Sequence, residues 1–202
     1  MEGFREALAR QRWDDHRYYH HSRINQSLHF FSAACFVVAY VLLFIDPPAA
    51  ALVAWLLSMT SRQAGHFFFE PRDYDVVNQA THDHKEEIKV GYNLQRKRVL
   101  MGIWALSPLL LLADPTLFGV FQPADGIDAF AHQVGWMWLV VGVGGLVFRM
   151  VQLFFQQGVM AGIAWGTKIL TDPFHDLMLY YRAPFALLRG ELIDPMHARH
   201  HS

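Results

Sequence analysis

Long apolar stretches alternate with charged segments along the chain. Four of these stretches are candidate membrane spans, and they cover about residues 28–45, 49–69, 99–113 and 131–169. A helix needs roughly 20 apolar residues to cross the ~30 Å hydrocarbon core of a bilayer. The first and fourth stretches meet this requirement. The second and third meet it only if their polar ends lie at the interface or line a cavity.

The composition agrees with a membrane protein. Of the 202 residues, 53% are hydrophobic and 17% are charged, and the mean hydropathy is +0.15. We therefore predict an all-α, polytopic membrane protein with about four transmembrane helices. Apolar residues at helical spacing after residue 171 predict an amphipathic C-terminal segment at the membrane interface. A soluble helical bundle with unusually buried helices is the alternative.

The charge pattern predicts how the chain is organised across the membrane. We expect one membrane domain over residues 1–202, with an N-terminal arm (1–26), a transmembrane bundle (27–170) and an interfacial or cytoplasmic tail (171–202). Lys and Arg lie in the arm, the central loop and the tail, and none lies at residues 46–48 or 114–133. The positive-inside rule then places both termini in the cytoplasm. The N-terminus lacks the apolar core of a signal peptide.

Two classes of function are disfavoured at this level. The net charge is −1, so no basic surface indicates nucleic-acid binding. The single cysteine, Cys35, lies in an apolar stretch and excludes a disulfide framework or a CxxC zinc site within the chain. The twelve histidines are the unusual feature. All except His132 fall on or near the predicted cytoplasmic side, which indicates one site at that membrane surface.

The spacing of the histidines indicates which of them lie together. On a helix, residues four apart share a face, so His21, Asn25 and His29 in the sequence YHHSRINQSLH form one stripe. In GHFFFE, His66 and Glu70 are also four apart. A very short connection joins the first two apolar stretches, so these stretches pack antiparallel and the two stripes meet at one membrane face.

Converging imidazoles and a carboxylate suit a non-haem Fe(II) centre for O₂ chemistry, and zinc uses similar ligands. Single interfacial histidines also serve as hydrogen-bonded anchors without a metal. His82 and His84 lie in a polar loop, where they either belong to the solvated surface or contribute to the site.

At these residues the chain resembles the Mpo1-like (DUF962) family of membrane proteins, which includes a 2-hydroxy fatty acid dioxygenase. The family signature, Y-H-H followed by N and H after three residues each, matches YHHSRINQSLH at every position. A second signature, Q-x-x-G-H-x-x-x-E, matches RQAGHFFFE except that one residue separates Gln63 from Gly65 instead of two. These motifs cover residues 19–72.

The resemblance implies an Fe(II)-dependent dioxygenase in the membrane that uses O₂ to shorten a 2-hydroxy fatty acid by one carbon. The first-choice metal ligands are His21, His29 and His66, followed by His20, with His82 and His84 as further candidates. Glu70 is expected to bind the metal or to orient a ligand, and Asn25 to support a ligand. Arg62 or Arg23 is expected to pair with the carboxylate of the fatty acyl substrate.

Two other functions remain open from the sequence. The first is a membrane di-iron hydroxylase or desaturase, because two groups of histidines imitate its motifs. These groups are His16, His20 and His21, and His197, His200 and His201. The second is a non-enzymatic membrane protein that holds haem or a metal through its interfacial histidines.

Overall fold

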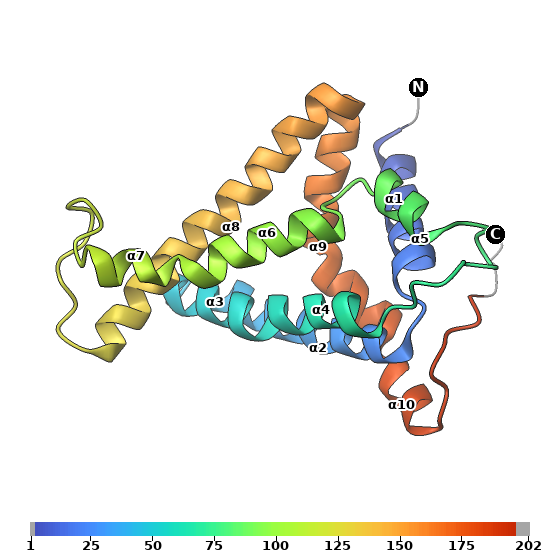
Figure 1. Ribbon diagram of the computed structural model, residues 1–202, viewed down its shortest axis with the longest axis horizontal. Helices are drawn as coiled ribbons and strands as arrows, with labels where there is room; N and C mark the ends of the chain where they lie inside the picture. The colour runs from blue at the N-terminus through green and yellow to red at the C-terminus, as the bar shows by residue number, and fades with distance from the viewer. Residues whose placement is uncertain (1–2, 197–202) are drawn as a thin grey trace.

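The computed structural model describes residues 3–196, and this part of the chain is helical with no β-strand (Figure 1). The α-helices in chain order are α1 (Phe4–Tyr19), α2 (Arg23–Leu42), α3 (Pro47–Val53), α4 (Thr60–Ala64), α5 (His82–Ile88), α6 (Leu94–Leu106), α7 (Pro108–Ala113), α8 (Ile127–Gln157), α9 (Val159–Tyr180) and α10 (Ala183–Leu188). Two π-helical turns, η1 (Ala54–Met59) and η2 (Gly65–Phe69), flank α4. The all-α prediction is confirmed.

Two helices in the described range are long and apolar enough to cross a membrane. They are α2, with 20 residues, and α8, with 31 residues, judged by length and composition. The hydropathy pattern predicts four such spans. The third predicted span is divided at Ser107, because Pro108 starts the separate helix α7. The second predicted span consists of four short helical pieces, from α3 to η2.

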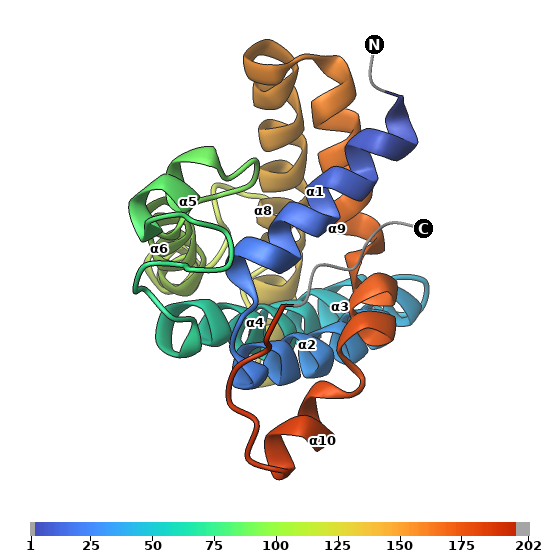
Figure 2. The ribbon, with the colours of Figure 1, turned by 90° about the vertical axis from the view of Figure 1, so that its right-hand side faces the viewer.

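The first two apolar stretches form an antiparallel pair. After α2, the chain turns within a few residues, and the Asp46 side chain caps α3 by accepting a hydrogen bond from the Ala49 backbone N–H (3.1 Å). The pieces from α3 to η2 then run back along α2 (Figures 1 and 2). Between them, the hydroxyls of Ser32 and Ser58 are 3.0 Å apart. The pairing confirms that the start of α2 and the end of η2 lie at the same end of the molecule.

The fourth apolar stretch forms two helices, and the prediction of one continuous span over 131–169 is wrong. The chain turns at Gly158, whose φ of 93° lies in the left-handed region that glycine adopts without steric cost. Helices α8 and α9 pack against each other on either side of this turn (Figure 1). Helix α9 then continues to Tyr180, past the boundary predicted at residue 170.

Three tryptophans hold α6 against the rest of the molecule. The Trp104 ring stacks on Trp55 and packs at a tilt against Trp138, with centroid distances of 5.1 and 5.0 Å. The Trp138 indole N–H donates a hydrogen bond to the Ser107 hydroxyl (3.0 Å). These contacts fix the C-terminal half of α6, whereas its N-terminal half lines the cavity described below.

At the end of the molecule away from these tryptophans, segments that are far apart in sequence lie side by side. Helix α1 crosses α9, and the chain after α10 returns toward the start of α2 (Figure 2). In this return, the Arg23 backbone N–H donates to the Leu192 carbonyl (2.9 Å), and the Asp194 N–H donates to the His21 carbonyl (2.7 Å). The same end therefore holds the start of α2, the end of η2 and parts of α1 and α9.

Candidate metal centre

Three buried histidines from three segments meet at this end of the molecule. His20 follows α1, His29 lies near the start of α2, and His66 lies in η2. The Nε2 atom of His29 lies 3.2 Å from Nε2 of His20 and 3.2 Å from Nε2 of His66. Their side chains are almost closed to solvent, with exposed fractions between 1% and 7%. These three residues form the histidine group.

The outward nitrogens of two of these rings face acceptors. Nδ1 of His20 lies 2.8 Å from the carbonyl oxygen of Asp15, which can only accept a hydrogen bond, so Nδ1 carries the proton. Nδ1 of His29 lies 3.6 Å from a carboxylate oxygen of Asp176. With the protons of His20 and His29 on Nδ1, the Nε2 lone pairs of these two rings point at each other. This arrangement is unfavourable alone, and a cation among the three nitrogens would stabilise it.

The environment of His20 favours the neutral ring that a metal ligand needs. Burial holds the pKa of His20 well below the ordinary value of an imidazole, and the charge that His29 would carry lowers it further. The histidine group could therefore hold a metal ion. Three imidazoles suit Fe(II) and zinc alike, so the donor set leaves the identity of the metal open.

Glu70 and Asn25 lie outside the histidine group and hold the segment that carries His20. The Glu70 carboxylate accepts hydrogen bonds from the His21 backbone N–H (2.6 Å) and from Nδ2 of Asn25 (2.7 Å). Asn25 Nδ2 also donates to the Tyr19 carbonyl (2.9 Å). Burial raises the pKa of Glu70, and these hydrogen bonds oppose the rise. Both residues thus position the chain between α1 and α2.

Gly65 lets η2 approach α2 at this point. A Cβ atom at Gly65 would lie 2.0 Å from Oδ1 of Asn25, and Asn25 is completely buried and cannot move aside. We therefore expect Gly65→Ala to lower the free energy of unfolding by about 1–3 kcal/mol, the usual cost of overpacking. Thermal unfolding of the purified protein measures this change.

The matched control is Gly102→Ala in α6. A Cβ atom there meets nothing within 4 Å, and alanine favours a helix by about 1 kcal/mol over glycine. This variant should be as stable as the wild type or slightly more so. Equal unfolding temperatures for the Gly65 and Gly102 variants would contradict the close approach.

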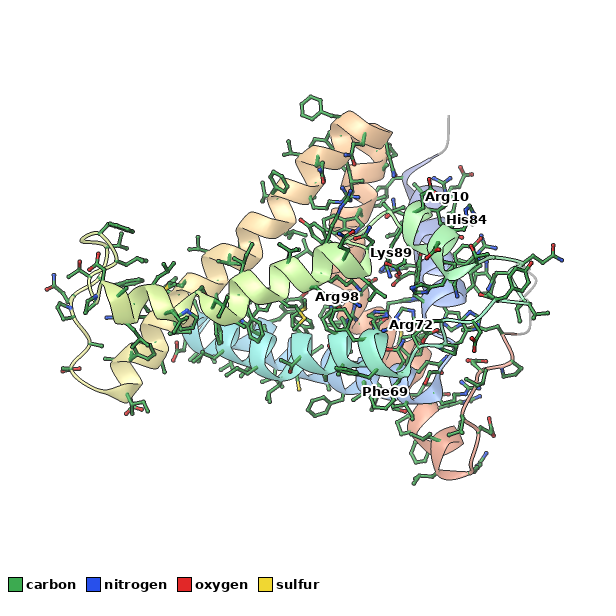
Figure 3. All side chains as sticks on the ribbon, viewed as in Figure 1. Arg10, Phe69, Arg72, His84, Lys89 and Arg98 are labelled. Atoms are coloured by element: carbon green, nitrogen blue, oxygen red, sulfur yellow. The ribbon has the colours of Figure 1, made fainter. Side chains whose placement is uncertain are left out.

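The structure does not bring the other predicted ligands to the histidine group. Nε2 of His21 lies 3.0 Å from a carboxylate oxygen of Asp75, and the same oxygen lies 3.4 Å from the Lys85 ammonium. His82 lines a small pocket that also reaches His66. His84 is exposed on the outer side of α5 (Figure 3).

The remaining histidines lie elsewhere. Nδ1 of His16 lies 3.1 Å from the Tyr180 hydroxyl. His132 lies at the far end of the molecule, with Nε2 3.5 Å from Asp46. His197, His200 and His201 lie outside the described residues.

A cavity of about 660 Å³ opens beside the histidine group. Its polar end includes Arg62, Gln63, His66, Lys89, Lys97 and Lys168 together with the carboxylates of Asp14, Asp15 and Asp172, and its apolar walls include Phe36, Trp55, Met59, Leu139, Leu146 and Trp165. Arg62 forms an ion pair with Asp176 at the cavity wall. A volume in this range suits one small ligand, because such sites usually measure ~300–1,000 Å³.

Helix α9 supplies buried polar residues beside the histidine group and the cavity that sequence reasoning missed. Lys168, Asp172, Asp176 and Tyr180 recur every four residues and form a buried polar stripe in an apolar helix. The Lys168 ammonium contacts the carboxylates of Asp172 (2.6 Å) and Asp15 (3.0 Å). The regular four-residue spacing of these polar residues is the feature of the sequence from which the stripe could have been predicted. The predicted amphipathic segment after residue 171 is divided between the end of α9 and the short helix α10.

Fold and site together define an all-helical protein with two candidate membrane-spanning helices and a buried three-histidine group that could hold a metal ion. Comparison of the chain with protein-family models, curated proteins and solved structures finds no match. The resemblance to the Mpo1-like family therefore depends on the motifs within residues 19–72, which contain all three histidines of the group.

Proposed function

We propose that the protein is a membrane-bound, Fe(II)-dependent dioxygenase that shortens 2-hydroxy fatty acids by one carbon. The convergence of three buried Nε2 atoms beside the cavity carries this proposal. The polar end of the cavity suits a lipid head group, and the apolar part suits its chain. The motifs shared with the Mpo1-like family supply the reaction class.

Large apolar side chains on the outside of the molecule support a membrane location. Val38 and Val41 of α2 and Val140, Val147 and Phe148 of α8 are each more than half exposed. An apolar surface of this kind is costly in water and favourable in a bilayer. The distribution of Lys and Arg supports the cytoplasmic assignment of both termini that forms part of this proposal.

The residues of this chain have separate tasks in the proposed reaction. His20, His29 and His66 would hold Fe(II), and Asp15 and Asp176 would fix the orientation of two of these rings. Bound Fe(II) would supply the redox chemistry that activates O₂. The cavity walls would exclude water and align the 2-hydroxy acid. The atoms and electrons balance with carbon dioxide and water as the other products, so the reaction needs no external reductant.

The geometry favours this function over a di-iron enzyme and over a haem protein. A di-iron enzyme needs a second cluster of ligands, and the described residues contain the histidine group as their one group of three or more convergent ligands. His16, which the di-iron motif requires, contacts Tyr180 instead. A haem protein needs a flat slot between two axial ligands. Three imidazoles converging from three segments instead suit a single metal ion.

Metal analysis combined with an activity assay tests the proposal. We expect protein purified without oxygen and reconstituted with Fe(II) to bind about one iron per chain. It should convert 2-hydroxyhexadecanoic acid into pentadecanoic acid with O₂ uptake and without added reductant. Hexadecanoic acid and 3-hydroxyhexadecanoic acid should remain unchanged.

Other outcomes would replace the proposal with a defined alternative. Two irons per chain and a requirement for a reductant would favour the di-iron enzyme, and a Soret band would favour haem. Tight zinc binding without oxygenation would overturn the dioxygenase assignment.

A further inference from the structure

Two lysines at the polar end of the cavity lack acidic partners. Lys89 follows α5, Lys97 lies in the first turn of α6, and both side chains are half-buried (Figure 3 labels Lys89). Within residues 3–196, neither ammonium forms an ion pair with a carboxylate. The Lys89 ammonium instead lies over the Tyr19 ring, 3.4 Å from its centroid.

The other lysines in this region are neutralised. Lys85 lies beside Asp75, with the ammonium 3.4 Å from the carboxylate. Lys168 lies between Asp15 and Asp172. Buried charges are normally paired in this way, because an unpaired charge removed from water is costly. The unpaired state of Lys89 and Lys97 is therefore the exception that requires an explanation.

The charged form of each of the two lysines is disfavoured where it lies. Burial lowers the pKa of Lys97 well below its ordinary value, and the nearby charge of Lys89 lowers it further. Burial also lowers the pKa of Lys89. An anion between the two ammonium groups would remove this conflict.

The arginines that the sequence offered for a substrate carboxylate are already paired. Arg62 forms an ion pair with Asp176, and Arg23 forms one with Asp194 (2.8 Å). The apolar part of the same cavity begins beyond the polar end and includes Leu100 and Met101 of α6. The carboxylates that also line the cavity are already paired, Asp14 with Arg17 and both Asp15 and Asp172 with Lys168. The cavity thus joins two unpaired ammonium groups to an apolar part of limited volume, which matches a single acyl chain with one anionic head.

We propose that Lys89 and Lys97 bind the carboxylate of a free, single-chain fatty acid and hold its head group beside His66. For the reaction that follows binding, this inference rests on the proposed dioxygenase function. Binding itself requires no metal. The site then selects the free acid over an ester or thioester, because those forms lack the carboxylate that the two lysines bind.

Quenching of tryptophan fluorescence tests the inference in metal-free, full-length protein in detergent. Trp55, Trp138 and Trp165 line the cavity, so a bromine atom on a bound chain quenches their emission. The probes are a hexadecanoic acid brominated near the middle of its chain and the methyl ester of the same acid. We expect the wild type to bind the acid about tenfold or more tightly than the ester.

Charge-removing variants identify the residues responsible. Lys89→Gln and Lys97→Gln should each weaken binding of the acid by about tenfold and leave ester binding unchanged, because each removes one charge-assisted hydrogen bond. Lys97→Arg should retain acid binding. The matched control is Arg98→Gln, at the exposed neighbouring position on α6, which should bind both probes as the wild type does (Figure 3).

Two results would overturn the inference. The glutamine variants could bind the acid as tightly as the wild type, or they could lose acid and ester binding equally. Thermal unfolding confirms that each variant is folded, and Lys97→Met replaces a glutamine variant that is not. The binding assay contains neither iron nor a 2-hydroxy group. Failure of the dioxygenase proposal would therefore leave the binding result intact, and failure of the binding inference would leave the dioxygenase test intact.

Discussion

Alanine in place of His20, His29 or His66 is expected to abolish metal binding and activity. Each residue directs one of three Nε2 atoms toward the same point. A residue that only orients a metal ligand is worth about 10–100-fold in affinity, and loss of a ligand itself costs more. Iron content after anaerobic reconstitution should therefore fall from about one per chain to a small fraction for each variant.

His21→Ala and His132→Ala are the matched controls. The side chain of His21 lies against Asp75 and that of His132 beside Asp46, so neither faces the histidine group. Both variants should keep the metal content of the wild type. If His21→Ala loses as much iron as His66→Ala does, the ligand set described here is wrong. Secondary structure measured by circular dichroism shows whether each protein is folded.

Asp176→Asn is expected to weaken metal binding by about 10–100-fold. The carboxylate of Asp176 faces Nδ1 of His29 and also pairs with Arg62. An amide of the same shape removes the negative charge that lies near Nδ1 of His29 and that offsets the guanidinium. Competition with a chelator of known affinity measures the change in metal affinity.

Asp172→Asn provides the comparison for Asp176→Asn. Asp172 lies one helical turn earlier on α9 and pairs with Lys168, with no contact to the three histidines. Its replacement should lower stability, while the folded fraction binds metal as the wild type does. Equal losses of metal affinity in the two variants would show that Asp176 acts through the general charge of α9 and not through His29.

The pairing of α2 with the segment from α3 to η2 could be predicted from the sequence. A short turn between two apolar stretches forces them to run antiparallel, and the four-residue spacing of polar side chains identified the faces that meet. Where the two segments meet, Gly65 lets the backbone of η2 lie close to Asn25. These features depend on neighbours in sequence, which periodicity can describe.

The choice between His20 and His21 could not be predicted from spacing. The stripe from His21 to His29 assumed a helix that already includes residue 21. Helix α2 begins at Arg23 instead, with Ser22 as its N-cap, because the Ser22 hydroxyl accepts a hydrogen bond from the Asn25 N–H (3.4 Å). The two histidines therefore lie in a non-helical link, where adjacent side chains point in opposite directions. His20 enters the histidine group and His21 faces Asp75.

The contribution of α9 depends on tertiary structure that no local pattern describes. One glycine, Gly158, reverses the chain and brings Asp176 to His29. The place of Lys89 and Lys97 in the cavity could not be predicted either, because both residues appear in the sequence as ordinary members of a basic loop. Only the packing of α6 over the cavity distinguishes them from exposed neighbours such as Arg98.

The return of the C-terminal chain to the start of α2 has a consequence for biosynthesis. Arg23 pairs with Asp194, which lies 171 positions later in the chain. A nascent chain that has completed both histidine segments still lacks Asp176 and Asp194. The environment of the histidine group is therefore complete only after α9 and the chain that follows α10 have been synthesised. A product that ends before α9 carries the three histidines without the carboxylate that faces His29.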